Sequence, residues 1–208
     1  MFGGNFQTWK LHSAQDYFMF FAYLLAGVMV FWLIAKHMNK QRNHEKAVEK
    51  VSARLKKICG KPGEVLKNAT LNLPEGKMTF DAVLMDKRGV YLVRTYGWGI
   101  KIYGTPDGAM WRREDAKRKE EFENPLLELK KGAAEITKVM EENGVQNLKV
   151  MPMVVFADNF KTPELYLGYG SFSTTYQELK SWYKKQSGVK EVQYDYDKVS
   201  SVIKGLAK

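Results

Sequence analysis

Residues 17–35 of the chain, YFMFFAYLLAGVMVFWLIA, contain no charged side chain. As an α-helix rising about 1.5 Å per residue, this segment would be about 28 Å long, close to the thickness of the hydrocarbon core of a bilayer. The aromatic residues Tyr17, Tyr23 and Trp32 stand toward its ends, where the boundary between lipid and water favours them. Length and composition therefore predict a transmembrane helix.

A cleaved signal peptide and a buried core helix are the two alternatives for an apolar segment near an N-terminus. The small residues of a signal-peptidase site do not follow residue 35, and the segment is longer than the apolar region of a typical signal peptide. We therefore favour a membrane span, preceded by a short tail of residues 1–16.

The flanks of the predicted span differ in charge. Lys10 and Asp16 precede it, whereas residues 36–60 contain eight Lys or Arg and two Glu. Because Lys and Arg accumulate at cytoplasmic ends, we expect a single-pass protein of the cell membrane with its N-terminus outside and its main domain in the cytoplasm. Anionic lipid headgroups would then account for much of the net charge of +10, so this charge alone does not indicate nucleic acid.

The chain has one cysteine, Cys59, and three histidines, none of which follows residue 44. A single cysteine excludes an intramolecular disulfide and fits a reducing compartment. We interpret Cys59 as a small buried residue at a helix end rather than as a reactive thiol. The histidine positions argue against a histidine-based zinc or acid–base site in the main domain.

Residues 36–60 are expected to form a basic juxtamembrane helix, the first helix of an α/β domain that occupies residues 61–208. Val48, Val51 and Leu55 recur at helical spacing and give this helix one apolar side. No helix-breaking residue separates it from the predicted span, so the two could form one continuous helix.

The rest of the chain alternates between strand-like and helix-like segments. The sequence predicts strands at 64–73, 77–85, 90–96 and 150–158, a hairpin that joins 99–104 to 108–112, and helices at 124–143, 173–186 and 194–205. The charged segment 112–123 mixes both signs and is expected to be a solvated loop or a frayed helix. Together these elements predict one α/β domain with a mixed sheet.

The stretch DAVLMDKRGVYLVRTYGWG, residues 81–99, is predicted to be two strands joined by a tight turn at 86–89. This turn would place Asp81 directly opposite Arg94, with Tyr96 on the same face as Arg94. An arginine that faces an aspartate can form a two-pronged ion pair with it.

The order of these elements, together with several local sequence phrases, resembles the nuclease-related domain (NERD), a relative of the restriction-endonuclease-like PD-(D/E)XK nucleases. The phrases are Glu49 followed by Val51 and Leu55, TFDAVLM with Asp81, GVYLVRTYGWG, IKIYG through Trp111, and NPLLELKKG. The resemblance covers about residues 41–157. It implies a restriction-endonuclease-like mixed sheet flanked by helices.

In enzymes of this kind, an Asp and a Glu hold a divalent cation, and a Lys two residues after the Glu steadies the developing charge. The resemblance assigns Asp81 and Glu49 as the metal ligands, but the two E-x-K positions carry Arg94 and Tyr96. Glu128 stands where a glutamine is often found. We therefore expect a vestigial site of Glu49, Asp81, Arg94 and Tyr96 without a resident cofactor.

Our hypothesis is that Arg94 replaces the metal, because its guanidinium would occupy the space of the ion and repel it. The protein would then be a pseudoenzyme, a cytoplasmic binding or scaffolding module for nucleic acid or a protein partner. Its candidate contact residues are Trp98, Lys101, Tyr103, Trp111 and Lys131. Tyr96 could join the aromatic residues in a platform on which nucleotides stack, although packing within the strand is the simpler interpretation.

Two alternatives remain at this level. One is a membrane-tethered nuclease dependent on Mg or Mn, in which Glu49, Asp81 and either Glu64 or Glu128 regroup around the ion and Lys131 or Lys101 replaces the missing lysine. The other is a structural subunit of a membrane assembly, held by the apolar span and the C-terminal helix. The sequence indicates neither the natural ligand nor the oligomeric state.

Overall fold

The computed structural model describes residues 13–41, 44–97, 100–115, 118–157, 162–186 and 194–207. It divides into two compact units, Met1–Lys40 and Gln41–Lys208.

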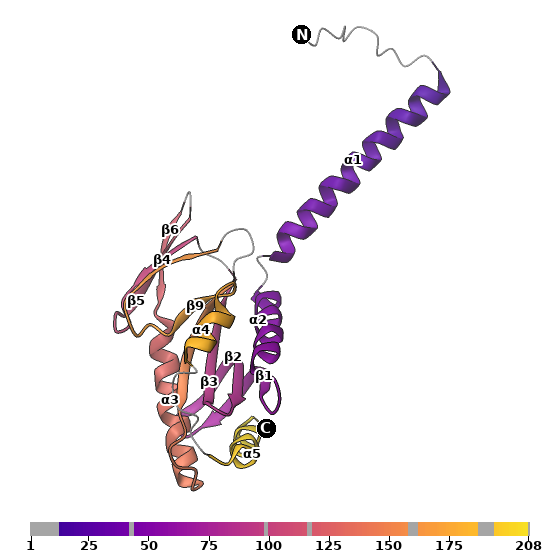
Figure 1. Ribbon diagram of the computed structural model, residues 1–208. Coiled ribbons are helices and arrows are strands. Elements are labelled where there is room, and N and C mark those ends of the chain that lie inside the picture. The colour runs from indigo at the N-terminus through magenta and orange to yellow at the C-terminus, as the bar shows by residue number, and fades with distance from the viewer. Residues whose placement is uncertain are drawn as a thin grey trace. The chain divides into compact units, whose positions relative to one another are not determined.

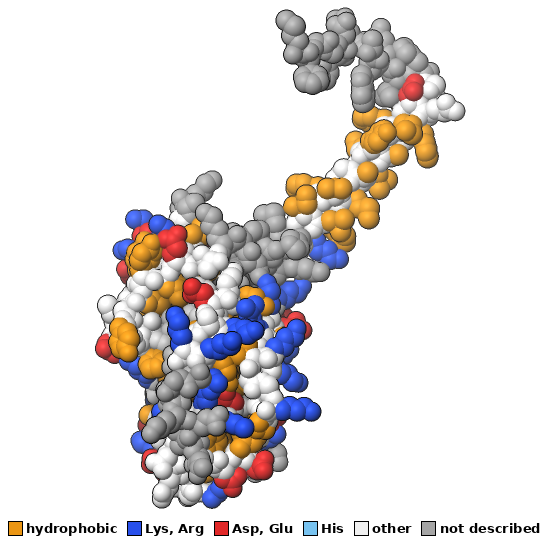
Figure 2. Space-filling view, viewed as in Figure 1, with side chains coloured by type: hydrophobic (Ala, Val, Ile, Leu, Met, Phe, Trp, Pro, Cys, Tyr) orange, Lys and Arg blue, Asp and Glu red, His pale blue; other side chains and the backbone are white. Residues whose placement is uncertain are grey.

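The first unit is built on one long helix, α1 (Ala14–Gln41). Ser13 begins it with reciprocal bonds: the Ser13 hydroxyl accepts the N–H of Asp16 at 3.2 Å, and the Asp16 carboxylate accepts the N–H of Ser13 at 3.0 Å. The stretch Ala14–Lys36 has a mean hydropathy of 2.3 and is 0% buried, and Figure 2 shows hydrophobic side chains along its visible side. Such a helix fits a membrane anchor and a signal sequence alike.

The second unit contains two sheets. The larger sheet has the strand order β1-β2-β3-β7-β9, and the smaller sheet the order β6-β5-β4-β8. The strands of the larger sheet are β1 (Glu64–Leu73), β2 (Gly76–Asp86), β3 (Gly89–Tyr96), β7 (Val150–Phe156) and β9 (Ser173–Thr175). Those of the smaller sheet are β6 (Lys119–Glu123), β5 (Met110–Glu114), β4 (Lys101–Gly104) and β8 (Glu164–Leu167). Both sheets mix parallel and antiparallel pairs, so the α/β class is confirmed, with two mixed sheets in place of one.

Helices cover both faces of the larger sheet (Figure 1). On one face, α2 (His44–Cys59) and α4 (Leu179–Gln186) bring Leu55 and Leu179 into a buried cluster with Leu84. On the other face, α3 (Pro125–Glu142) and α5 (Tyr196–Leu206) bring Leu129 and Ile203 into a second buried cluster. Successive side chains of a strand point to opposite faces, so each central strand contributes to both clusters.

The helices of the second unit begin and end near the predicted residues, except at the starts of α2 and α4. α1 ends at Gln41 and α2 begins at His44, whereas one basic helix was expected over 36–60. Asn124 caps α3 as predicted, since its side-chain oxygen accepts the N–H of Leu126 at 2.9 Å. Cys59 is the last residue of α2 and is half-buried, and burial raises the pKa of its thiol.

The register predicted for residues 81–94 is confirmed. β2 pairs with β3 through Ala82 and Val93, Met85 and Val90, and the turn residues between them. Gly89 closes the turn with φ of 138°, and a Cβ at this position would clash with the carbonyl oxygen of Lys149. The turn therefore requires glycine for its backbone conformation and for the close approach of the neighbouring chain.

The expectation that residues 112–123 form a loop or a frayed helix is wrong. They contribute to β5 and β6, an antiparallel pair in which Arg112 lies opposite Glu121 and Arg113 opposite Glu120. The side chains of Arg113 and Glu120 form an ion pair. Because opposite charges face each other across the two strands, the mixed run stabilises a hairpin rather than a helix.

The helix expected over 173–186 is also partly wrong, because α4 begins at Leu179 and residues 173–175 form β9. The β-branched residues Thr174 and Thr175 are buried there beside β7. The short strand β8, which pairs with β4, was not predicted.

The smaller sheet has one buried face and one exposed face. Ile102 and Trp111 are buried in the cluster that contains α3, and the Trp111 indole N–H donates to the carbonyl oxygen of Thr105 at 2.8 Å. Tyr103 and Arg112 are cross-strand neighbours whose side chains lie on the opposite face.

Leu129→Ala and Leu127→Ala test the packing of α3. Leu129 is fully buried, whereas Leu127 is 40% exposed on the same helix. Leu129→Ala should lower the free energy of unfolding by about 2–5 kcal/mol, and Leu127→Ala by about 0.5 kcal/mol or less. Urea unfolding of the detergent-solubilised chain measures both values, and equal losses would contradict the assigned burial.

Candidate functional site

Asp81 is a buried carboxylate at the point where β2, β3 and α2 meet. One of its oxygens accepts the backbone N–H of Thr95 at 2.6 Å. The other lies 3.4 Å from Nε2 of His44 and 3.7 Å from a guanidinium nitrogen of Arg94. The side chain of Asp81 is 7% exposed, so these groups compensate a charge that is largely removed from water.

Arg94 extends from β3 between two carboxylates. Its shorter contact is to Glu128, in the first turn of α3, with a donor–acceptor distance of 2.7 Å. The predicted two-pronged bond to Asp81 is therefore wrong, because the guanidinium bridges Asp81 and Glu128. Glu128 also lies near the N-terminus of α3, where the helix dipole favours negative charge.

The backbone across from Asp81 is distorted. The ladder between β1 and β2 pairs Lys67 with Ala82 and Ala69 with Phe80, which leaves Asn68 facing Asp81 between them. Asn68 has φ of 49°, in the left-handed region that asparagine tolerates better than most residues. The strand pair thus departs from regular geometry at the position of the buried carboxylate.

Tyr96 packs in the core and does not form a platform. Its ring stacks on Phe156 with centroids 5.6 Å apart and tilts against Phe122 at 5.5 Å. Burial raises the pKa of Tyr96 to about 12, while the positive charge of Arg94 acts in the opposite direction. The phenol is neutral at physiological pH. Trp98, the predicted neighbour of Tyr96, lies outside the described residues.

On α2, the structure brings His44 to Asp81, whereas Glu49 is exposed. His44 is the first residue of α2 and lies one turn before Val48, so the apolar stripe of the helix extends back to it. Helical spacing could have identified this residue. The position of His44, before the segment predicted as the main domain, gave no indication of this contact.

The residues proposed to regroup around a metal have other partners. Glu64 pairs with Lys204 at 2.8 Å, Lys131 with Glu75 at 2.9 Å, and Lys101 with Glu164 at 3.8 Å. Glu64 also lies opposite Met85, four residues along β2 from Asp81, which corresponds to about 13 Å.

The charge arrangement around Arg94 does not fit a divalent cation. Such an ion requires converging oxygen ligands, and the guanidinium lies between the carboxylates of Asp81 and Glu128. Within the described ranges, no group of three or more His, Cys, Asp or Glu is placed to hold a metal.

The exposed face of the smaller sheet carries a second feature, which we call the aromatic face: Tyr103, Tyr166, Arg112 and Lys101. The rings of Tyr103 and Tyr166 stack with centroids 4.8 Å apart and an interplanar angle of 8°. The guanidinium of Arg112 lies 5.0 Å from the centre of the Tyr103 ring. The prediction that Trp111 is a contact residue of this surface is wrong, because Trp111 is buried on the opposite face.

Two substitutions at Arg94 test the role of its charge. Arg94→Glu would place a third carboxylate beside Asp81 and Glu128, and Arg94→Gln would remove the cation without adding a charge. Both should lower the free energy of unfolding by about 1–3 kcal/mol, because Asp81 loses a partner. Millimolar Mn²⁺ should restore stability to Arg94→Glu alone, which thermal unfolding with and without the metal measures. Unchanged stability and no response to metal in Arg94→Glu would contradict the assigned bridge.

Comparisons with known proteins identify the family of the chain. The family model of the nuclease-related domain matches residues 40–157, more than half of the chain. An uncharacterized protein of Bacillus anthracis is 32% identical over 96 residues, which cover 45% of this chain and 44% of that protein. The chain therefore spans less than half the length of this relative. No solved structure matches the chain significantly. The match to the family model, over strands and helices that include Asp81, Arg94 and Glu128, shows that the chain belongs to the nuclease-related domain (NERD) family.

Proposed function

We propose that this protein is a membrane-anchored NERD domain that binds single-stranded nucleic acid without cleaving it. The observation that carries the proposal is the position of Arg94, whose guanidinium lies between the carboxylates of Asp81 and Glu128. A family named for its relation to nucleases supplies the ligand class. The argument against hydrolysis comes from the side chains of Arg94 and Tyr96 in this chain.

Hydrolysis of a phosphodiester in nucleases of this kind needs a cation at the reacting phosphate and a positively charged group to stabilise the transition state. Arg94 occupies the space beside Asp81 and repels a second cation. Tyr96 stands two residues later, where a lysine would supply positive charge, and it is a partly buried neutral phenol. On this proposal, the site keeps the strand pair that carries Asp81 and Arg94 but lacks the charge arrangement that hydrolysis needs.

The aromatic face supports nucleic acid as the ligand. Base–aromatic stacking requires an exposed ring, and Tyr166 is 50% exposed beside the parallel ring of Tyr103. The hydroxyl of Tyr166 donates to Glu164 at 2.7 Å, which fixes the orientation of the ring. Arg112, opposite Tyr103 on β5, and Lys101, two residues before Tyr103 on β4, add positive charge beside these rings.

Acidic partners moderate that positive charge. Lys101 lies 3.8 Å from Glu164, and Arg112 lies 3.3 Å from Glu114. Because these pairs already neutralise part of the charge, we expect stacking to contribute more to affinity than phosphate contacts do. Binding should therefore depend less on salt than it does for a protein that relies on many phosphate contacts.

The membrane anchor is the second half of the proposal. The mean hydropathy of 2.3 over Ala14–Lys36 supports a span, and the excess of Lys and Arg over residues 36–60 supports a cytoplasmic domain. The mixed sheet flanked by helices on both faces is consistent with a restriction-endonuclease-like arrangement. Tethering would keep the bound nucleic acid at the inner surface of the membrane.

Tyr103→Ala and Tyr166→Ala test nucleic-acid binding. With a fluorescent single-stranded oligonucleotide and the full chain in neutral detergent, each substitution should weaken binding by about 1–3 kcal/mol. Tyr169→Ala is the matched control, because Tyr169 is fully exposed and lies outside the aromatic face. Fluorescence anisotropy at several salt concentrations measures the affinities.

The same samples test hydrolysis when Mg²⁺ or Mn²⁺ is added. Neither the oligonucleotide nor a plasmid should be shortened or nicked. Cleavage by the chain would establish the metal-dependent alternative. An absence of binding at low salt would assign the aromatic face to a protein partner instead.

The topology has its own test. A reporter fused after Lys208 should be active in the cytoplasm, and the mature chain should retain its N-terminal residues by mass spectrometry. A reporter found outside would reverse the orientation, and a chain shortened within α1 would identify a cleaved signal sequence.

A further inference from the structure

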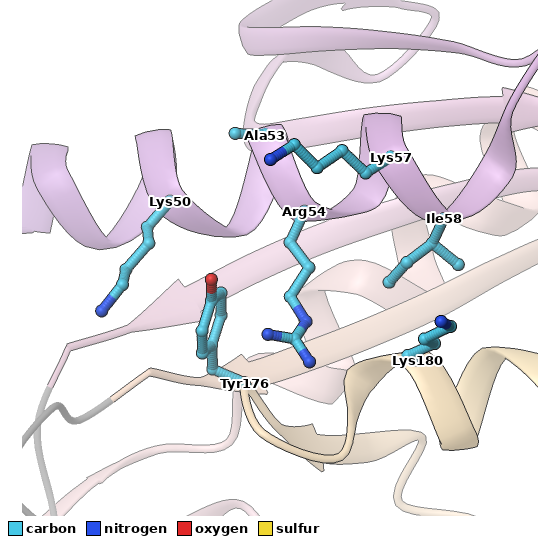
Figure 3. Close-up of a pocket in the computed structure, with 7 residues that line it drawn as sticks. All are labelled: Lys50, Ala53, Arg54, Lys57, Ile58, Tyr176 and Lys180. Atoms are coloured by element: carbon cyan, nitrogen blue, oxygen red, sulfur yellow. The ribbon is translucent and has the colours of Figure 1, made fainter.

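A pocket with a volume of about 400 Å³ lies between α2 and α4, on the face of the larger sheet away from Glu128 (Figure 3). It is lined by Lys50, Ala53, Arg54, Lys57, Ile58, Tyr176 and Lys180. Four of these residues are cationic, and none is acidic. Figure 2 shows that Lys and Arg side chains gather on this side of the domain.

The spacing of the cations follows from the helix. Lys50, Arg54 and Lys57 are four and then three residues apart, so they form one stripe along α2. Lys180 reaches the same pocket from the first turn of α4. Like charges at these spacings repel one another, so a bound anion would relieve an unfavourable arrangement.

Arg54 and Tyr176 give the pocket a fixed side. The guanidinium of Arg54 donates to the carbonyl oxygen of Gln177 at 3.3 Å and lies 4.6 Å from the centre of the Tyr176 ring. Lys50 lies 5.0 Å from the same ring. Figure 3 shows the ring between these two cations. Arg54 has five N–H donors, of which this bond to Gln177 uses one.

The remaining cations and the apolar residues have different uses. Lys57 and Lys180 are exposed and flexible, so their ammonium groups can close on an anion from two helices. Ala53 and Ile58 provide a small apolar surface beside the charges. This combination suits a compact anionic group attached to a short carbon chain.

We propose that this pocket binds a phosphate monoester, either as the headgroup of a lipid such as phosphatidic acid or as a soluble phosphate ester. A monoester carries a charge of about −1.5 to −2 at neutral pH and three terminal oxygens, which suit a pocket lined by several cations. A phosphodiester offers one negative charge and two free oxygens. The proposal stands apart from nucleic-acid binding, because the pocket shares no residue with the aromatic face.

The test uses the full chain in nanodiscs of neutral phosphatidylcholine and follows binding by titration calorimetry. The probes are glycerol 3-phosphate, dihexanoyl phosphatidic acid and, as a phosphodiester, dihexanoyl phosphatidylglycerol. We expect the monoesters to bind more tightly than phosphatidylglycerol. A clear preference for phosphatidic acid over glycerol 3-phosphate would identify a lipid as the source, and equal affinity would identify a soluble ester.

Paired substitutions separate the pocket from the general positive charge. Lys57→Gln combined with Lys180→Gln should weaken monoester binding about tenfold or more. Lys56→Gln combined with Lys185→Gln removes the same charge from the same two helices at exposed positions outside the pocket, and should leave affinity unchanged. Both variants should keep the urea midpoint of the parent chain, because none of the four lysines is buried.

Four results would overturn the proposal. The first is equal weakening by both double variants, and the second is equal affinity for monoester and diester. The third is the absence of monoester binding at low salt. Displacement of the bound ester by an oligonucleotide without terminal phosphates would likewise assign the pocket to phosphodiesters.

Discussion

The register between β2 and β3 is the constraint on which both the core and the site depend. The pairing of Met85 with Val90 places one set of side chains against α2 and α4 and the alternate set against α3 and α5. A slip of one residue would exchange the two sets and bring Arg94 to the wrong face. Gly89 fixes the register because no larger residue fits beside Lys149 in this turn.

Once that register is set, Arg94 is the residue that links the two carboxylates of the site. A guanidinium between Asp81 and Glu128 holds two carboxylates from different elements at one place, as a divalent ion would, but it offers no open coordination position. An ion pair with one buried partner, such as Arg94 with Asp81, fixes geometry more reliably than it adds net stability. This arrangement is the basis on which we propose a surface for binding rather than a centre for hydrolysis.

The parts of the fold that follow from local rules could be predicted from the sequence. The turn at residues 86–89 determines the register, and Asn124 with Pro125 determines the start of α3, because both signals act within a few residues. The strands β6 and β8 were missed for a physical reason. Each is short, and each is stabilised by cross-strand partners that are distant or oppositely charged rather than by its own apolar pattern.

The site was less predictable than the fold, because its contacts join elements that the sequence does not place relative to one another. Facing positions on β2 and β3 could be counted, but the bond from Arg94 to Glu128 depends on how α3 packs. In the same way, the start of α2 selects His44 in place of Glu49. Such contacts can be identified only when the positions of the helices relative to the sheet are known.

Asn68 gives the site a consequence that concerns the backbone. A left-handed residue other than glycine costs on the order of 1–3 kcal/mol, and this one faces Asp81 within a ten-residue strand, where regular pairing was available. The surrounding sheet must therefore outweigh a local preference for flat, evenly hydrogen-bonded strands. β1 is an edge strand of the larger sheet, and a residue that departs from extended backbone there hinders the docking of another chain's strand at that point. The contour that surrounds a carboxylate inside the domain thus also limits unwanted association outside it.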